Sequence, residues 1–277
     1  MLLTNDNYFG KEMDMKYLSV SQFKNFAGAP FKEGCEFRAL AELKGEYERE
    51  PSVALLVGSY TDCLLTEPHL LEKFENENKD IFKYKKPENG LKKDFLVAKQ
   101  MASRVKQDKK FMAYMDGEHQ KIYTGTLFGV EWKIEPDTIN FEKGFISDLK
   151  TCESIRKGYW TPDGRMNFIE YFDYVLQAAI YQEIVFQNTG KRLPFYICAI
   201  SKEEDTDFEV IYLDNETLHD RIYGNEFQEG IANQVNAIRI VKNGEVEPCR
   251  CGSCSWCRKH KSIKKPIHFT ELLGEIN

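Results

Sequence analysis

Residues 136–150 read PDTINFEKGFISDLK, and this short stretch decides the fold. Its β-branched and aromatic residues favour strands, while Asn140 and Gly144 are typical turn residues. The pattern therefore predicts a β-hairpin, with one strand ending near Asp137 and the next carrying residues Asp148 to Thr151.

Charged side chains of this hairpin are expected to lie together. Side chains alternate along a strand, so Asp148 and Lys150 share one face while Leu149 points into the core. Asp137, Asp148 and the carbonyl of Leu149 can then hold a hard divalent cation such as Mg²⁺ or Mn²⁺. A cation beside an ammonium suits phosphodiester hydrolysis, because both stabilise developing negative charge. Taken alone, the pattern also fits a solvated hairpin edge with an ion pair.

A long helix is predicted after the hairpin, over residues 166–190. Apolar residues recur at helical spacing from Phe168 to Ile184, and a glycine at position 190 is a typical helix end. We therefore expect an amphipathic helix. Gln177 and Tyr181 are four residues apart and lie on one face of it, either as ordinary surface residues or beside the acidic site.

The order of these motifs resembles the PD-(D/E)xK nuclease superfamily, in its RecB-like and phage-exonuclease branch. That order is a P-D pair, a D-L-K strand and a helix with Q-x-x-x-Y, and the resemblance extends over residues 19–261. It implies an α/β fold of the restriction-endonuclease type, with a mixed central sheet flanked by helices, a helical N-terminal extension and a C-terminal cysteine cluster. The catalytic residues that it implies are Asp137, Asp148, Lys150, Gln177 and Tyr181, the last two contacting substrate.

The group that the chain resembles most is RecE-like, also called exodeoxyribonuclease VIII-like. The implied activity is metal-dependent degradation of linear duplex DNA from its ends, in phage or prophage recombination. The implied partners are linear double-stranded DNA and a single-strand annealing protein, and a homo-oligomer is a further expectation. Two alternatives stay open: an exonuclease of the CRISPR-adaptation type, and a catalytically silent module that binds DNA or protein with the same fold.

Further metal ligands are expected from the same resemblance. Residues 54–62 are similar to the family's G-x-x-x-H helix, whose histidine helps to hold the metal, but this chain has Asp62 at that position. Aspartate is a good oxygen ligand for Mg²⁺ or Mn²⁺, so we expect Asp62 to replace the histidine. Glu118 is the expected remaining acidic ligand. Asp116 or Glu135 could take that role instead, and Glu118 would then be an exposed loop residue.

Four of the eight cysteines fall within residues 249–257, CRCGSCSWC. This spacing is too dense for apolar packing and too short for unstrained disulfides, so it indicates metal ligation. Several RecB-like nucleases bind a [4Fe-4S] cluster through one cysteine before the core and three after it, and the matching residues here are Cys35, Cys251, Cys254 and Cys257. A local zinc site that uses Cys249 in place of Cys35 is the alternative, since both centres accept four thiolates. The other three, expected to be core thiols, are Cys63, Cys152 and Cys198.

The whole chain, 1–277, is expected to form one nuclease domain, since its length and 42% hydrophobic content allow a sizeable core. We expect a helical N-terminal part (16–115), a catalytic α/β core (116–214) and a helical C-terminal part with the cysteine cluster (215–277). Further elements are expected at 94–107, as a helix, and at 195–201 and 208–213, as strands.

Charge and composition narrow the function classes. No apolar run approaches the length of a membrane span, and the N-terminal segment is polar and acidic, without the features of a signal peptide. Unpaired core cysteines beside a thiolate cluster indicate a reducing cytoplasm. The net charge of −6 disfavours DNA binding over the whole surface. Basic runs, which are either solvated faces or tracks for a DNA backbone, occur at 83–86, 92–93, 104–110 and 258–265.

Overall fold

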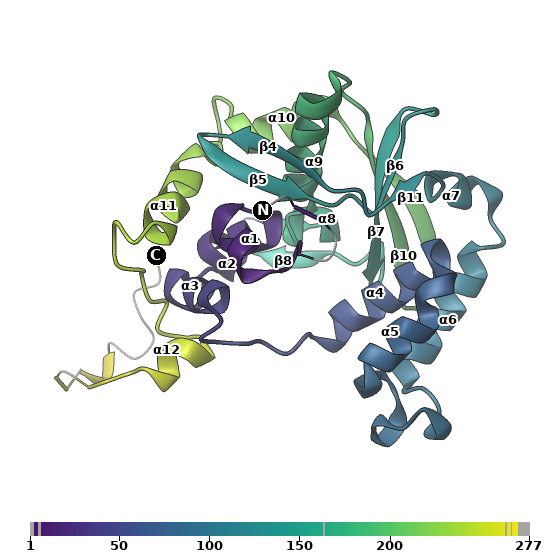
Figure 1. Cartoon of the computed structure of the whole chain (residues 1–277), viewed down its shortest axis with the longest axis horizontal. Helices are drawn as coiled ribbons and strands as arrows, with labels where there is room; N and C mark the ends of the chain where they lie inside the picture. The colour runs from purple at the N-terminus through teal and green to yellow at the C-terminus, as the bar shows by residue number, and fades with distance from the viewer. Residues whose placement is uncertain (1–2, 5–6, 163, 264, 267, 271–277) are drawn as a thin grey trace.

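A five-stranded mixed sheet forms the centre of the computed structural model (Figure 1), which describes residues 3–4, 7–162, 164–263, 265–266 and 268–270. The strands lie in the order β11-β10-β7-β6-β3, and only the β7–β10 pair is parallel among them. Parallel neighbours need a crossover connection, which here includes helix α9 (Tyr174–Thr189). The strand bounds are β3 Glu118–His119, β6 Thr138–Asn140, β7 Phe145–Cys152, β10 Phe195–Ser201 and β11 Phe208–Leu213.

The two faces of the sheet are buried against different layers, because alternate side chains leave each strand on opposite sides. Leu149 and Cys198 face a cluster built by α4 (Val53–Thr66), α6 (Lys93–Val105) and α7 (Lys109–Tyr114). Ile146 and Ile197 face the other cluster, which includes residues of α9, α10 (Asn215–Tyr223) and the hairpin of β4 (Tyr123–Leu127) and β5 (Val130–Ile134). This arrangement is the mixed α/β fold that the sequence predicts, and the strands of 195–201 and 208–213 are confirmed.

Segments from both ends of the chain pack together beside the sheet. Helices α1 (Lys11–Lys16), α2 (Val20–Ala27) and α3 (Glu36–Lys44) lie against α11 (Ala232–Lys242), and the chain then crosses to α4 through residues 45–52 (Figure 1). The N-cap of α2 is Ser19, whose hydroxyl accepts a hydrogen bond from the Gln22 N–H. Within the described residues, no helix is long and apolar enough to span a bilayer. The remaining elements are β1 Gly28–Ala29, β2 Lys32–Glu33, η1 Pro68–Leu70, α5 Leu71–Glu77, η2 Lys79–Ile81, η3 Lys83–Lys85, η4 Pro87–Asn89, β8 Tyr159–Thr161, β9 Gly164–Met166, α8 Phe168–Tyr171 and α12 Ser255–Lys259.

The central hairpin is present as β6 and β7, but the prediction for its first strand was wrong in one respect. Asp137 lies directly before β6 instead of at the end of a strand, because the preceding strand β5 pairs with β4 in a separate two-stranded sheet. Residues 135–137 therefore carry the chain from one sheet to the other. This places Asp137 where the chain enters the central sheet.

The single long helix expected over 166–190 is two helices, α8 and α9, separated at residues 172–173. Asp173 adopts a left-handed conformation (φ 53°), which interrupts the helical backbone. Two cations hold the break: Arg221 donates to both carboxylate oxygens of Asp173 at 2.7 and 3.0 Å, and Lys24 donates to the carbonyls of Phe172 and Asp173. Helix α9 is also buried on most sides, so the expected amphipathic pattern was wrong.

Candidate active site and thiolate centre

Asp148 occupies the middle of β7 and is almost fully buried, with 2% of its surface exposed. One carboxylate oxygen accepts a hydrogen bond from Gln177 Nε2 on α9 at 2.7 Å, and the other contacts Lys150 Nζ. The contact with Lys150 arises because residues two apart in a strand share a face. Helix α9 therefore supplies a donor, and β7 supplies a cation, to the same carboxylate.

Asp137 lies beside Asp148 and is fixed by the backbone of β7. Its Oδ2 accepts a hydrogen bond from the Leu149 N–H at 2.8 Å, so the peptide of Leu149 lies against the acidic pair. Burial, followed by the negative charges of Asp148 and Asp62, raises the pKa of Asp137 well above its ordinary value. His119 Nδ1 lies 3.0 Å from the carbonyl oxygen of Asp137 and so contacts the same segment.

The Lys150 ammonium is held between acidic and aromatic groups. Burial alone lowers its pKa, but the carboxylates of Asp148 and Asp137 outweigh burial and raise the pKa above its ordinary value. Lys150 Nζ also lies 4.8 Å from the centre of the Tyr174 ring, in a cation–π contact. The lysine therefore remains charged at neutral pH and acts as a fixed positive charge at this site.

Tyr181 lies one helical turn beyond Gln177, as the sequence predicts for residues four apart on α9. Burial, followed by the nearby Tyr8 and Asp148, raises the pKa of Tyr181 well above its ordinary value, so its hydroxyl stays protonated. Gln177 and Tyr181 line a cavity of about 430 Å³, together with Lys24 and Glu135.

A second cavity, of about 610 Å³, opens beside Asp137 and is lined by Asp62, Glu67 and Glu135 among others. Asp62 lies on α4, and burial together with the charge of Asp148 raises its pKa to about 6, against the effect of a hydrogen bond from Thr66. Burial and Glu67 also raise the pKa of Glu135. Carboxylates of separate elements thus converge on this cavity.

The structure does not bring Glu118 to this acidic group. Its carboxylate is exposed and is paired with Lys121 at 2.5 Å, and Glu118 does not line either cavity. The competing Asp116 is likewise exposed and paired with Lys143 at 2.8 Å. Glu135 is the one of these three candidates that lines both cavities.

Sequence reasoning missed three residues near the site: Glu67, His119 and Lys24. Glu67 directly follows α4, and Pro68 ends that helix. The sequence therefore predicts the helix end, but it does not predict that Glu67 lines the cavity beside Asp137. Lys24 reaches residues 172–173 from α2, across 148 positions of sequence, and no local pattern signals that contact.

Four cysteine sulfurs form a second group, at the junction of α3 and α12. The Sγ atoms of Cys35, Cys251, Cys254 and Cys257 all lie within 4.8 Å of one another, and the separations of Cys35 from Cys257 and Cys254 are 3.6 and 3.8 Å. Backbone N–H groups of Cys254 and Cys257 donate to the sulfurs three residues earlier. Burial alone raises the pKa of Cys251, but hydrogen bonds from the Ser253 hydroxyl and the Cys254 backbone N–H outweigh it and lower the pKa to about 6, which favours the thiolate.

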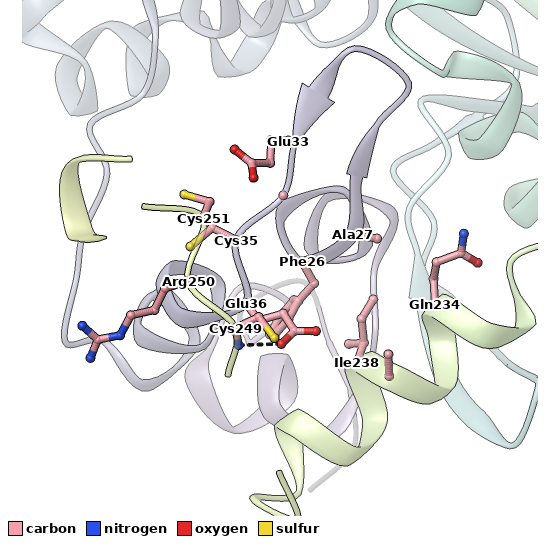
Figure 2. A pocket seen from close by; sticks show the side chains of 12 residues that line it. Phe26, Ala27, Glu33, Cys35, Glu36, Gln234, Ile238, Cys249, Arg250 and Cys251 are labelled. Atoms are coloured by element: carbon pink, nitrogen blue, oxygen red, sulfur yellow. Dashed lines mark hydrogen bonds between the residues drawn. The ribbon is translucent and has the colours of Figure 1, made fainter. Parts of the chain in front are cut away.

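Cys249 lies outside this group of sulfurs. Figure 2 shows it apart from Cys35 and Cys251 at the wall of a cavity of about 310 Å³, with its backbone N–H bonded to the Glu36 carboxylate at 2.8 Å. Its side chain is exposed. The remaining three cysteines are buried free thiols in the described structure: Cys63, Cys152 and Cys198.

The central hairpin of the mixed sheet brings Asp137, Asp148 and Lys150 together, and a helix places Gln177 against them. This arrangement defines a domain of the PD-(D/E)xK class. Residues 19–260 match the family described as "PDDEXK-like domain of unknown function (DUF3799)", and the chain belongs to this family.

A solved structure agrees with this assignment over the full length. The crystal structure of a "putative exonuclease" from Eubacterium rectale is 40% identical in sequence, covers 100% of both chains and aligns with a TM-score of 0.91. The structure of SSO0001 covers 79% of this chain and 88% of its own at 16% identity, but its TM-score of 0.29 carries no argument about the fold. No curated protein matches the chain.

Proposed function

We propose that this protein is a metal-dependent exodeoxyribonuclease that degrades linear duplex DNA from its ends. The observation that carries the proposal is the single polar group in which Asp148 contacts both Gln177 and Lys150, with Asp137 bonded to the adjoining peptide. The family is PDDEXK-like, and the Eubacterium rectale relative is named as an exonuclease, which supports both the nuclease activity and its exonucleolytic mode.

The donor set fits a hard divalent cation. Burial, followed by repulsion from neighbouring carboxylates, raises the carboxyl pKa values of Asp62 and Asp137, and a cation would offset that repulsion. We assign Asp137, Asp148 and the Leu149 carbonyl as ligands of Mg²⁺ or Mn²⁺, with Asp62 in place of the family histidine. Such a cation supplies Lewis-acid polarisation of the phosphodiester and makes a water molecule more acidic.

Each remaining side chain has a role that its contacts allow. Lys150 stays protonated, so it stabilises negative charge that develops on the phosphate and does not serve as the base. Gln177 orients the Asp148 carboxylate through its 2.7 Å hydrogen bond. The protonated hydroxyl of Tyr181 lies at the adjoining cavity, where it can donate to substrate. The contacts that Gln177 and Lys150 make with Asp148 disfavour a silent binding module, which has no need of a charged, half-buried lysine beside a buried carboxylate.

End dependence separates this proposal from other nuclease activities. The experiment compares linear duplex DNA with a covalently closed circle of the same sequence, each in Mg²⁺ and in a chelator. The proposal expects release of nucleotides from the linear duplex in Mg²⁺ only. Digestion of the closed circle, or no digestion of either substrate, would contradict it. The annealing partner, the homo-oligomer, the cytoplasmic location and the role in phage recombination stay predictions.

For the thiolate centre we propose one structural zinc ion instead of a [4Fe-4S] cluster. A zinc–sulfur bond of about 2.3 Å makes the edge of a tetrahedral four-thiolate site about 3.8 Å. The separations of Cys257 from Cys35 and Cys251 are 3.6 and 4.0 Å, that of Cys254 from Cys35 is 3.8 Å, and all four sulfurs lie within 4.8 Å of one another. In a cluster each thiolate binds a different iron, which requires the sulfurs to stand further apart. Metal analysis after anaerobic purification should find about one zinc in a colourless protein. A brown protein containing about four irons would overturn this assignment.

A further inference from the structure

A row of aromatic rings leads from the catalytic lysine to the surface of the molecule. Tyr174 contacts Lys150, and the Phe172 ring follows with its centre 5.8 Å from that of Tyr174. Tyr159 lies 5.5 Å from Phe172, and Tyr171 stacks on Tyr159 at 4.3 Å. With Phe31, which is described next, these rings form what we call the aromatic strip: Phe31, Tyr159, Tyr171, Phe172 and Tyr174.

The aromatic strip combines fixed rings with exposed ones. Tyr171 is stacked between Tyr159 and Phe31, with interplanar angles of 18° and 9°, so these three rings hold one another in place. Phe172 remains 41% exposed, and Trp160, which follows Tyr159 in β8 and leaves the strand on its other side, flanks the strip and is 81% exposed. A lone exposed aromatic side chain is ordinary, but a connected row that begins at a catalytic site indicates a binding surface.

Cations accompany the rings. Lys24 Nζ lies 5.5 Å from the Tyr174 ring centre, and Lys157 Nζ lies 5.5 Å from that of Tyr159. Lys32 and Arg165, on β2 and β9, are exposed and have no ion-pair partner within the described ranges. Interleaved rings and cations are the pattern by which proteins hold single-stranded nucleic acid, with bases on the rings and phosphates beside the cations.

We propose that the aromatic strip binds single-stranded DNA that is continuous with the strand in the carboxylate site. The inference rests on the proposed nuclease function, and it adds a path for the unpaired strand next to the chemistry. The exposed face of Phe172 stacks on a base, and the half-buried rings beneath it keep its orientation. Trp160 offers a second, flanking ring at the edge of the strip. A paired duplex does not fit this surface in the same way, because its base faces are covered by neighbouring bases.

The test measures binding without cleavage. In full-length protein carrying Asp148→Asn, a labelled oligothymidylate of eight nucleotides is titrated by fluorescence anisotropy. Phe172→Leu and Trp160→Leu should each weaken binding by about 5- to 100-fold, the effect of one lost base–aromatic stack. Tyr212→Leu is the matched control: that ring is 53% exposed on the edge strand β11, outside the strip, and its loss should leave affinity unchanged.

Tryptophan fluorescence gives a second readout. Trp132 is fully buried, and Trp256 packs against Tyr47 and His260 beside the thiolate centre, so quenching by the oligonucleotide should disappear mainly with Trp160→Leu. Unchanged affinity in both the Phe172 and Trp160 variants would overturn the aromatic-strip proposal. The proposal would also be overturned if Phe172→Leu weakened the binding of a duplex with hairpin-closed ends as much as it weakened the binding of the single strand. Digestion of linear duplex by the unmodified protein is measured separately. Failure of the aromatic-strip proposal therefore leaves the nuclease proposal intact, and failure of the nuclease proposal is seen in the digestion assay alone.

Discussion

The carboxylate site and the thiolate centre are built in opposite ways. The residues that define the first lie mainly within 136–150, on β7 and directly before the adjacent strand β6, and they bond to backbone and helix groups of the core. The second joins sulfurs up to 222 residues apart in sequence, held on loops and short helices. The first is an assembly of hard oxygen donors that repel one another, and the second is an assembly of soft thiolates.

Because the two sites are built differently, we expect the two proposed metals to have different roles. Hydrogen bonds from the Leu149 main chain and the Gln177 side chain fix Asp137 and Asp148, so the proposed cation would serve the chemistry and not the fold. A metal ion held by the four sulfurs would tie the N-terminal helices to the C-terminal segment, so the proposed ion there would serve the fold. Removal of one metal should therefore stop cleavage, and removal of the other should lower stability.

Among the variants that keep the carboxylates, the largest effect is expected at Lys150. Lys150→Ala removes a fixed positive charge beside Asp148 and should lower the rate of duplex digestion by roughly 100- to 10,000-fold, the usual range for such a contributor. Binding of Mn²⁺, measured by calorimetry, should persist. Lys143→Ala, which removes an exposed lysine paired with Asp116, is the control and should digest normally. Full activity of Lys150→Ala would remove Lys150 from the site.

The next effect concerns the thiolate centre and appears in stability. Cys35→Ser breaks a tie across more than 200 residues, a loop whose closure is worth about 5 kcal/mol, so the melting temperature should fall by roughly 10–20 °C. Cys249→Ser changes an exposed thiol outside the group and should not alter zinc content or melting. The reverse order of these two variants, measured by scanning calorimetry, would favour a local site that uses Cys249.

A smaller effect is expected from Asp62, which couples the carboxylate site to α4. Because a carboxylate favours oxygen-loving cations, Mg²⁺ should support cleavage at least as well as Mn²⁺. Asp62→His should lower the Mg²⁺-supported rate by roughly 10-fold while sparing the Mn²⁺-supported rate. The measurement is the digestion rate in Mg²⁺ divided by the rate in Mn²⁺, for the unmodified protein and for Asp62→His. An unchanged ratio in the variant would show that residue 62 does not contact the metal.

The same contrast explains how much the sequence could predict. The hairpin and the two strands after it follow from local composition, and Asp148 and Lys150 share a face because side chains alternate along a strand. The contact of Gln177 with Asp148 joins a helix to a strand, and it was expected only from the family resemblance. The break at Asp173 could not be foreseen, since it depends on Arg221 from a later helix. Glu118 could not be placed without knowing that Lys121 would pair with it.

The thiolate centre lies between these cases. The spacing of residues 251–257 predicts ligation from local sequence, whereas the partnership with Cys35 came only from resemblance to a family. The identity of the ion depends on distances between sulfurs, and these exist only once the chain has folded. Local patterns thus predict which residues can bind, and tertiary structure decides which of them meet.

The most direct test of the account is the digestion rate of Asp148→Asn on linear duplex DNA in Mg²⁺. This change keeps the size of the side chain and an oxygen for the Gln177 hydrogen bond, but removes one charged ligand. The account predicts a rate below about a thousandth of the unmodified rate, because the cation and the charge that it supplies are lost. It also predicts an unchanged melting temperature without metal. Digestion at the unmodified rate by a folded Asp148→Asn protein would contradict the assignment of this site.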